Sequence, residues 1–225
     1  GELSGTQYTP EKGWDENKLD MFRRHIIQLG TTGVFVIYDE LEGKEAVTWS
    51  YLLHTVELPM EIQELTDEVK VIGKNKAGGV SVAHLFSSAK TEQAMVDTFF
   101  CAPTNWKNVT NAQGKTLKYP NHWHFSSTTV PCKTARFLTV MDTHGKNRPD
   151  MQVVRKGNTI QVGDWTITCN LTEKGKAAIY VSNKTEKVSL NYDAGKKEGA
   201  TIVTDQVKGK QVNEVLTDYL PDFEI

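Results

Sequence analysis

Sequence motifs that identify several large enzyme classes are missing from this chain of 225 residues. It has no Ser/His/Asp nucleophile elbow, no glycine-rich phosphate loop and no paired-carboxylate motif beyond what chance would supply. No apolar stretch approaches the ~20 residues of a membrane-spanning helix. The formal net charge is only -2 and the pI is about 6.3, so the composition gives no electrostatic reason to expect binding to nucleic acid or to an anionic membrane.

Cysteine is scarce, with only Cys101, Cys132 and Cys169 in the whole chain. An odd number excludes complete pairing within the chain, and no two cysteines have the CxxC spacing of a zinc site. We therefore predict no metal site and no cofactor. Cys169 lies in the strand-like alternation that begins at Trp165, so we expect a small buried hydrophobic side chain there.

The length and the apolar content bound the fold class. A hydrophobic fraction of 38% and a mean hydropathy of -0.45 fit a soluble globular protein. The length suits one large all-β domain, or one sandwich with a small appendage. Gly1 without an initiator methionine is typical of a processed or recombinant fragment.

The clearest strand signals lie between residues 22 and 55. Residues 22–29 alternate and end at Gly30, and residues 33–38 form a β-branched and aromatic run that predicts a strand buried on both faces. In residues 46–55, alternation places Trp49, Tyr51, Leu53 and Thr55 on one face. These segments predict three successive antiparallel strands.

The next part of the chain gives mixed signals. Residues 69–73 and 79–86 predict a hairpin with a loop at 74–78. Residues 88–99 are the best helical candidate, although a short strand at 94–100 fits the same spacing, and one helical turn is possible within 58–67. Residues 122–129 and 135–142 predict another pair of strands.

A polar segment with Gly and Pro, residues 143–150, predicts a boundary. Beyond it, short strands are expected at 151–155, 159–162, 165–170, 177–182, 188–192 and 201–207, while residues 213–225 are expected to form a tail with at most one helical turn. We predict an all-β fold: an entry loop at 1–19, an antiparallel β-sandwich at 20–145, and a smaller C-terminal β region at 146–225 that is either a second module or part of the same sandwich.

The block at 22–55 also resembles a known family. An Arg-rich strand, an apolar strand ending in Tyr-Asp-Glu-Leu and then Trp-x-Tyr-Leu-Leu-His resemble the region that follows the catalytic core of heparinase II/III-like polysaccharide lyases. Residues 79–86 and 137–140 resemble later strands of that domain, so the resemblance covers about residues 20 to 145. The residues that carry it most clearly are Arg24, Asp39, Leu41, Trp49 and His54.

The resemblance implies a function for the parent protein more than for this chain. The family's catalytic and zinc-ligand motifs lie upstream of this region. They include Asp-Pro-Gly and a later His-Asn, and neither of these two motifs occurs in this chain. The resemblance therefore implies a non-catalytic C-terminal domain of a lyase that acts on acidic, uronic-acid-containing polysaccharide. It also implies a missing N-terminal catalytic domain as a partner and a periplasmic or extracellular location. The alternatives are a free-standing carbohydrate-binding sandwich and a purely structural interaction domain.

Four residues are candidates for carbohydrate binding: Trp106, Trp123, His122 and His124. Trp106 lies in a polar loop where a flat ring can stack on a sugar, as can Trp123, Trp14, Tyr8 and Tyr119. His122 and His124 share one strand face about 7 Å apart, a spacing that can chelate a divalent ion but more often marks a polar sheet surface. Trp49 and Trp165 alternate with polar residues and are expected in the core.

Two further sets of side chains have competing interpretations. His54 and Asp39 could hold a metal or orient a base, but an Asp before a turn more often caps backbone amides. Arg23 and Arg24 could bind sulfates or uronates of an acidic glycan, but on an antiparallel sheet they more often pair with carboxylates across the strands.

Overall fold

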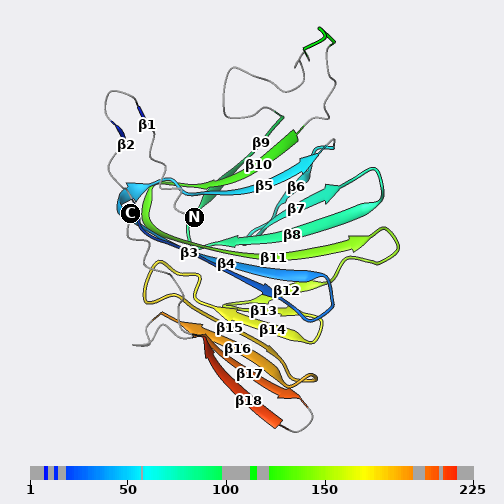
Figure 1. Ribbon diagram of the computed structural model, residues 1–225. Coiled ribbons are helices and arrows are strands. Elements are labelled where there is room, and N and C mark those ends of the chain that lie inside the picture. The colour runs from blue at the N-terminus through cyan, green and yellow to red at the C-terminus, as the bar shows by residue number, and fades with distance from the viewer. Residues whose placement is uncertain are drawn as a thin grey trace. The chain divides into compact units, whose positions relative to one another are not determined.

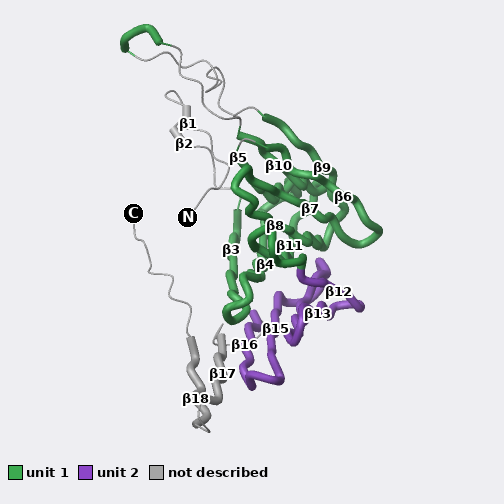
Figure 2. Tube along the Cα trace, turned by 90° about the vertical axis from the view of Figure 1, so that its right-hand side faces the viewer, with its two compact units in different colours: residues 1–150 green, residues 151–225 purple. Residues whose placement is uncertain are grey.

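A computed structural model describes residues 8–9, 13–14, 19–56, 58–97, 112–115, 122–194, 201–207 and 210–216. In these ranges the regular structure is entirely β, and every strand pair is antiparallel, as predicted. Among the same residues no helix has the length and apolarity needed to cross a membrane. The chain divides into two compact units, Gly1–Asp150 and Met151–Ile225 (Figure 2).

The first unit contains two main sheets. The larger has six strands in the order β3-β4-β11-β8-β7-β6, and the smaller has three in the order β5-β10-β9 (Figure 1). The strands of this unit are β1 (Tyr8–Thr9), β2 (Gly13–Trp14), β3 (Leu19–Gln28), β4 (Val34–Val47), β5 (Ser50–Val56), β6 (Glu61–Glu64), β7 (Val69–Lys74), β8 (Gly79–Ser87), β9 (Thr91–Val96), β10 (His122–Thr129) and β11 (Cys132–Gly145).

The two sheets pack face to face around a hydrophobic core. Because side chains alternate along a strand, residues two apart point to the same face, and part of one face of each sheet lines this core. Tyr51 and Phe125 of the small sheet contribute, as do Val71, Leu85 and Phe137 of the large one. The rings of Tyr51 and Phe137 lie 5.8 Å apart. Full burial of one such side chain contributes roughly 1.5–3 kcal/mol, so this core is the main stabilising feature of the sandwich.

Trp49 fixes the corner at which the chain leaves the large sheet for the small one. Its backbone N–H donates to the hydroxyl of Thr129 at 3.0 Å, and its carbonyl accepts from the Thr129 amide at 2.9 Å. Its indole N–H donates to the carbonyl of Cys132 at 3.1 Å. The ends of β5, β10 and β11 are therefore joined through one buried residue.

The other face of the six-stranded sheet is also buried. Tyr38, Leu138 and Val140 are each 0% exposed there. On β4 this face is the better covered one, because Val34 and Val36 are buried whereas Phe35 and Ile37, which point the opposite way, are only partly buried. The prediction of a strand buried on both faces is therefore only partly correct.

Three predictions for this unit were wrong. Residues 22–55 contain the three predicted strands, β3, β4 and β5, but β5 is not a neighbour of the other two, because it pairs with β10 and not with β4. Within residues 88–99, Thr91–Val96 form strand β9 and not a helix, since its alternate side chains turn inward and its backbone pairs with β10. Within residues 58–67, Glu61–Glu64 form strand β6 at the edge of the large sheet.

The second unit is one antiparallel sheet whose strands follow one another in chain order, from β12 to β18. Its strands are β12 (Val153–Lys156), β13 (Thr159–Val162), β14 (Trp165–Cys169), β15 (Ala178–Asn183), β16 (Val188–Asp193), β17 (Thr201–Val207) and β18 (Lys210–Leu216). The tail predicted to begin at residue 213 is wrong as far as Leu216, because these residues belong to strand β18. Cys169 is buried, as predicted. The polar segment at 143–150 overlaps the end of β11, so its first residues belong to a strand.

Candidate functional site

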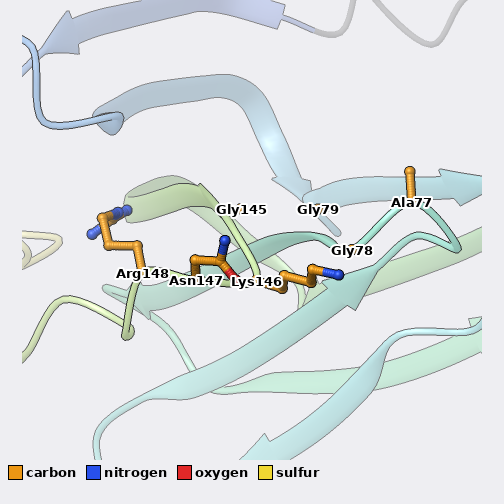
Figure 3. Close-up of a pocket in the computed structure, with 7 residues that line it drawn as sticks. All are labelled: Ala77, Gly78, Gly79, Gly145, Lys146, Asn147 and Arg148. Carbon is orange, nitrogen blue, oxygen red and sulfur yellow. The ribbon is translucent and has the colours of Figure 1, made fainter.

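Two loops at one end of the six-stranded sheet enclose an open hollow of ≈ 430 Å³ (Figure 3). One is the β7–β8 hairpin loop and the other follows β11. They lie together because Gly79, the first residue of β8, is the register partner of Gly145, the last residue of β11. We call this site the basic hollow; it is lined by Ala77, Gly78, Gly79, Gly145, Lys146, Asn147 and Arg148.

The sequence of the hairpin loop explains its shape. The side-chain carbonyl of Asn75 accepts a hydrogen bond from the Gly79 N–H at 2.8 Å, which closes the turn. Gly78 has a φ of 89°, a conformation that favours glycine. A Cβ at Gly78 would lie only 3.1 Å from Cδ of Lys146, so the missing side chain also makes room for the Lys146 stem.

The basic hollow carries positive charge. Lys146 is exposed and forms no ion pair with a residue that the structure describes. Arg148 is held in place, because its guanidinium donates to the buried carboxylate of Asp142 and, at 3.3 Å, to the carbonyl of Thr143. Lys74 and Lys76 add two exposed cations beside it. Ammonium, guanidinium, amide and backbone donors together are suited to carboxylate or sulfate groups.

Sequence reasoning missed this site, because residues 74–78 were predicted only as a hairpin loop and residues 146–148 as part of a boundary. One signal was available. The tripeptides Lys-Asn-Lys at 74–76 and Lys-Asn-Arg at 146–148 are similar, and each stands at the end of a strand. Only the β8–β11 pairing, however, brings the two together.

A second cluster lies on the surface of the three-stranded sheet. His122 and His124 share that surface, and His54 on β5 is the register partner of His124. The rings of His54 and His124 are 4.5 Å apart at an interplanar angle of 72°. His54 is exposed, His122 is partly buried and His124 is buried. We call these three residues the histidine face.

The electrostatics of the histidine face favour a neutral imidazole ring at His124. Burial lowers the pKa of His124, and the neighbouring rings of His54 and His122 lower it further. In the part of the chain that the structure describes, no group of three or more potential ligands stands in a ready metal-binding arrangement. The rings of His54 and His124 meet edge to face.

No family model and no curated protein matches this chain. The lyase resemblance stated above thus remains an expectation. Any function has to be inferred from the chemistry of the basic hollow, the histidine face and their surroundings.

The predicted carbohydrate-binding residues separate in the structure. Trp123 is partly buried and packs against the sandwich core. Its indole nitrogen is buried without a hydrogen-bond partner among the described residues. Trp106 and Tyr119 lie outside the described residues, as do the side chains of Trp14 and Tyr8. His122 and His124 share one strand face, as alternation predicted.

His54 and Asp39 are not brought together, so the metal or base site considered for this pair does not form. Asp39 lies in the middle of β4 and accepts two hydrogen bonds from Arg24, at 2.7 and 2.8 Å, which also corrects its expected role as a turn cap. That bond raises the pKa of Arg24. Arg23 pairs with Glu40 at 3.4 Å, so both arginines bind carboxylates across the strands, as the commoner interpretation predicted. Beneath Arg24, at 5.6 Å, lies the ring of Tyr51, whose pKa is raised by burial.

Proposed function

We propose that this chain is the non-catalytic β-sandwich part of a heparinase II/III-like polysaccharide lyase, and that it binds acidic, uronic-acid-containing polysaccharide at the basic hollow. The observation that carries the binding proposal is the meeting of two basic loops at one end of the sheet. The resemblance of residues 20–145 supplies the family.

The chemistry of the hollow explains why an acidic polymer is the preferred ligand. Lys146 supplies an exposed positive charge. Arg148, whose own charge is balanced by Asp142, supplies oriented guanidinium N–H donors. Lys74 and Lys76 extend the charge along the hairpin, so several anionic groups of one chain can be contacted at once. Because these groups are near the surface, binding weakens as salt is added.

The proposed parent supplies the chemistry that this chain lacks. Its N-terminal catalytic domain would carry the cleavage residues, and this domain would hold the polymer beside it, in the periplasm or outside the cell. The purified chain alone should then release no unsaturated uronides from heparan sulfate, chondroitin sulfate, hyaluronan or alginate. Ultraviolet absorbance of the reaction mixture tests this, and a steady rise in absorbance would contradict the non-catalytic assignment.

Binding is tested by titrating the chain into labelled oligosaccharides of the same four polymers and measuring fluorescence anisotropy. Lys146→Glu should weaken binding by about tenfold or more, which corresponds to about 1.4 kcal/mol. The matched control is Lys44→Glu. Val34, the first residue of β4, pairs with Asp142 near the end of β11 that borders the hollow. Lys44 lies toward the opposite end of β4, away from the hollow. The control should bind as the wild type does.

The result also separates the proposal from its alternative. A free-standing carbohydrate-binding sandwich would bind neutral oligosaccharides as well as acidic ones, would tolerate Lys146→Glu, and would lose binding in Trp106→Ala. Absence of binding to every glycan would overturn both carbohydrate proposals and favour a structural interaction domain.

A further inference from the structure

The histidine face combines three imidazoles from two neighbouring strands. We propose that His54, His122 and His124 bind one divalent transition-metal ion of the kind that prefers imidazole, such as zinc, nickel or copper. This site is separate from the basic hollow and does not depend on the polysaccharide proposal.

The strand register supplies the spacing that such a site needs. His54 and His124 are direct cross-strand partners, and residues paired in this way have Cβ atoms about 4.5–5.5 Å apart. His122 follows two residues away on β10, about 7 Å along the same face. Three imidazoles at the corners of this triangle can each reach a common ion at the usual metal–nitrogen distance of about 2.0–2.1 Å.

Apolar side chains lie beside the cluster. The register partner of His122 is Val56, and that of His124 on β9 is Val96, so apolar side chains flank the cluster. Burial and the neighbouring rings already lower the pKa of His124. A neutral imidazole offers a lone pair to a cation, whereas a protonated one does not.

Metal binding requires the rings to turn, because the described residues, as they stand, include no group of three or more side chains that could hold a metal ion. The two outer side chains have the freedom to do so. His54 is exposed and His122 is only partly buried, while the buried His124 provides the fixed point. Exposed side chains change rotamer within nanoseconds, so no rearrangement of the backbone is involved.

The test is calorimetric titration of the tag-free chain, first treated with a chelator, with zinc chloride. We expect one ion per chain. His54→Ala should weaken zinc binding by at least about 100-fold. This exceeds the loss of about 10- to 100-fold that is typical when a residue that only hydrogen-bonds a metal ligand is removed. His122→Ala should behave in the same way. The control is Ser126→Ala, which lies two residues from His124 on the same face and should bind zinc as the wild type does.

Cobalt(II) provides a second readout. The cobalt-loaded chain should show visible bands of a nitrogen-ligated ion and no near-ultraviolet band from thiolate, which excludes Cys132 and Cys169 as the ligands. His124→Ala should also lose zinc binding. If that variant fails to fold, His54→Ala and His122→Ala still decide the outcome. No zinc binding, or zinc binding that survives both outer substitutions, would overturn the proposal.

Discussion

The two sheets of the first unit use histidine in opposite ways. On the large sheet, His25 lies 3.2 Å from Glu40, His84 lies 2.6 Å from Glu68, and His144 lies 3.1 Å from Asp150. On the small sheet, His54 lies against His124 and next to His122. A carboxylate stabilises the protonated ring, whereas a second imidazole stabilises the neutral or the metal-bound one. The histidines of the large sheet therefore lie against carboxylates, whereas His54 and His124 of the small sheet lie against each other.

The largest effect is expected when a charge pair of the large sheet is broken. Arg24→Ala leaves the carboxylate of Asp39, which is 2% exposed, without its bidentate partner. We expect a loss of about 3 kcal/mol, the low end for a broken buried pair, because the Arg24 side chain itself is partly exposed. Urea denaturation measures it. If Arg24→Ala loses less free energy of unfolding than Asp39→Asn does, water must solvate the Asp39 carboxylate once Arg24 is gone, which would contradict this expectation.

A smaller loss is expected from Arg24→Lys. Lysine keeps the charge beside Asp39 but replaces a two-point contact with a single donor. Loss of one hydrogen bond to a charged group corresponds to about 1.5 kcal/mol, again measured with urea. Equal stability of the lysine variant and the wild type would mean that charge alone, and not the guanidinium geometry, matters here.

On the small sheet we expect acid sensitivity that originates at His124. The folded pKa of this ring is lowered from 6.5, so the unfolded chain takes up its proton first. The contribution is complete above pH 6.5 and is lost as the pH falls from 6.5 through the folded pKa. Thermal melts of the wild type and of His124→Gln, recorded between pH 7.5 and about pH 5 with chelator present, compare the two. A wild type that loses no more stability on acidification than the variant would contradict this effect.

The smallest effect is expected from His54→Glu, which gives the small sheet the pairing found on the large one. A carboxylate opposite His124 raises the pKa of that ring and stabilises its protonated form by about 0.2–1 kcal/mol at acidic pH. Titration of the imidazole resonances by NMR measures the change in pKa. An unchanged pKa would show that residue 54 does not reach the His124 ring.

The sequence predicted strands better than it predicted their partners. In the second unit each strand pairs with the next one in the chain, so turn residues such as Gly157 and Gly163, both at positive φ, were sufficient to locate the hairpins. In the first unit, β5 pairs with β10 and β4 with β11, across long stretches of chain. Alternation reports which face a residue occupies and says nothing of which strand lies beside it.

The same limit applies to the two sites. Alternation correctly placed His122 and His124 on one face, but the third histidine comes from β5, whose partner could not be predicted. Alternation also placed Trp123 on the opposite face of the same strand. It did not predict which of the two faces would pack against the core. In the hollow, Lys146 and Gly78 meet only because β8 and β11 are neighbours.

Strand β11 has a consequence for the order in which the protein folds during synthesis. It lies between β4 and β8, so the half-sheet of β3 and β4 and the half-sheet of β6, β7 and β8 have no shared backbone bonds without it. The ribosome must therefore release residue Gly145, the end of β11, before the large sheet can close, and such distant pairing is slow to form. The second unit, built from neighbouring hairpins, can add each strand as it emerges.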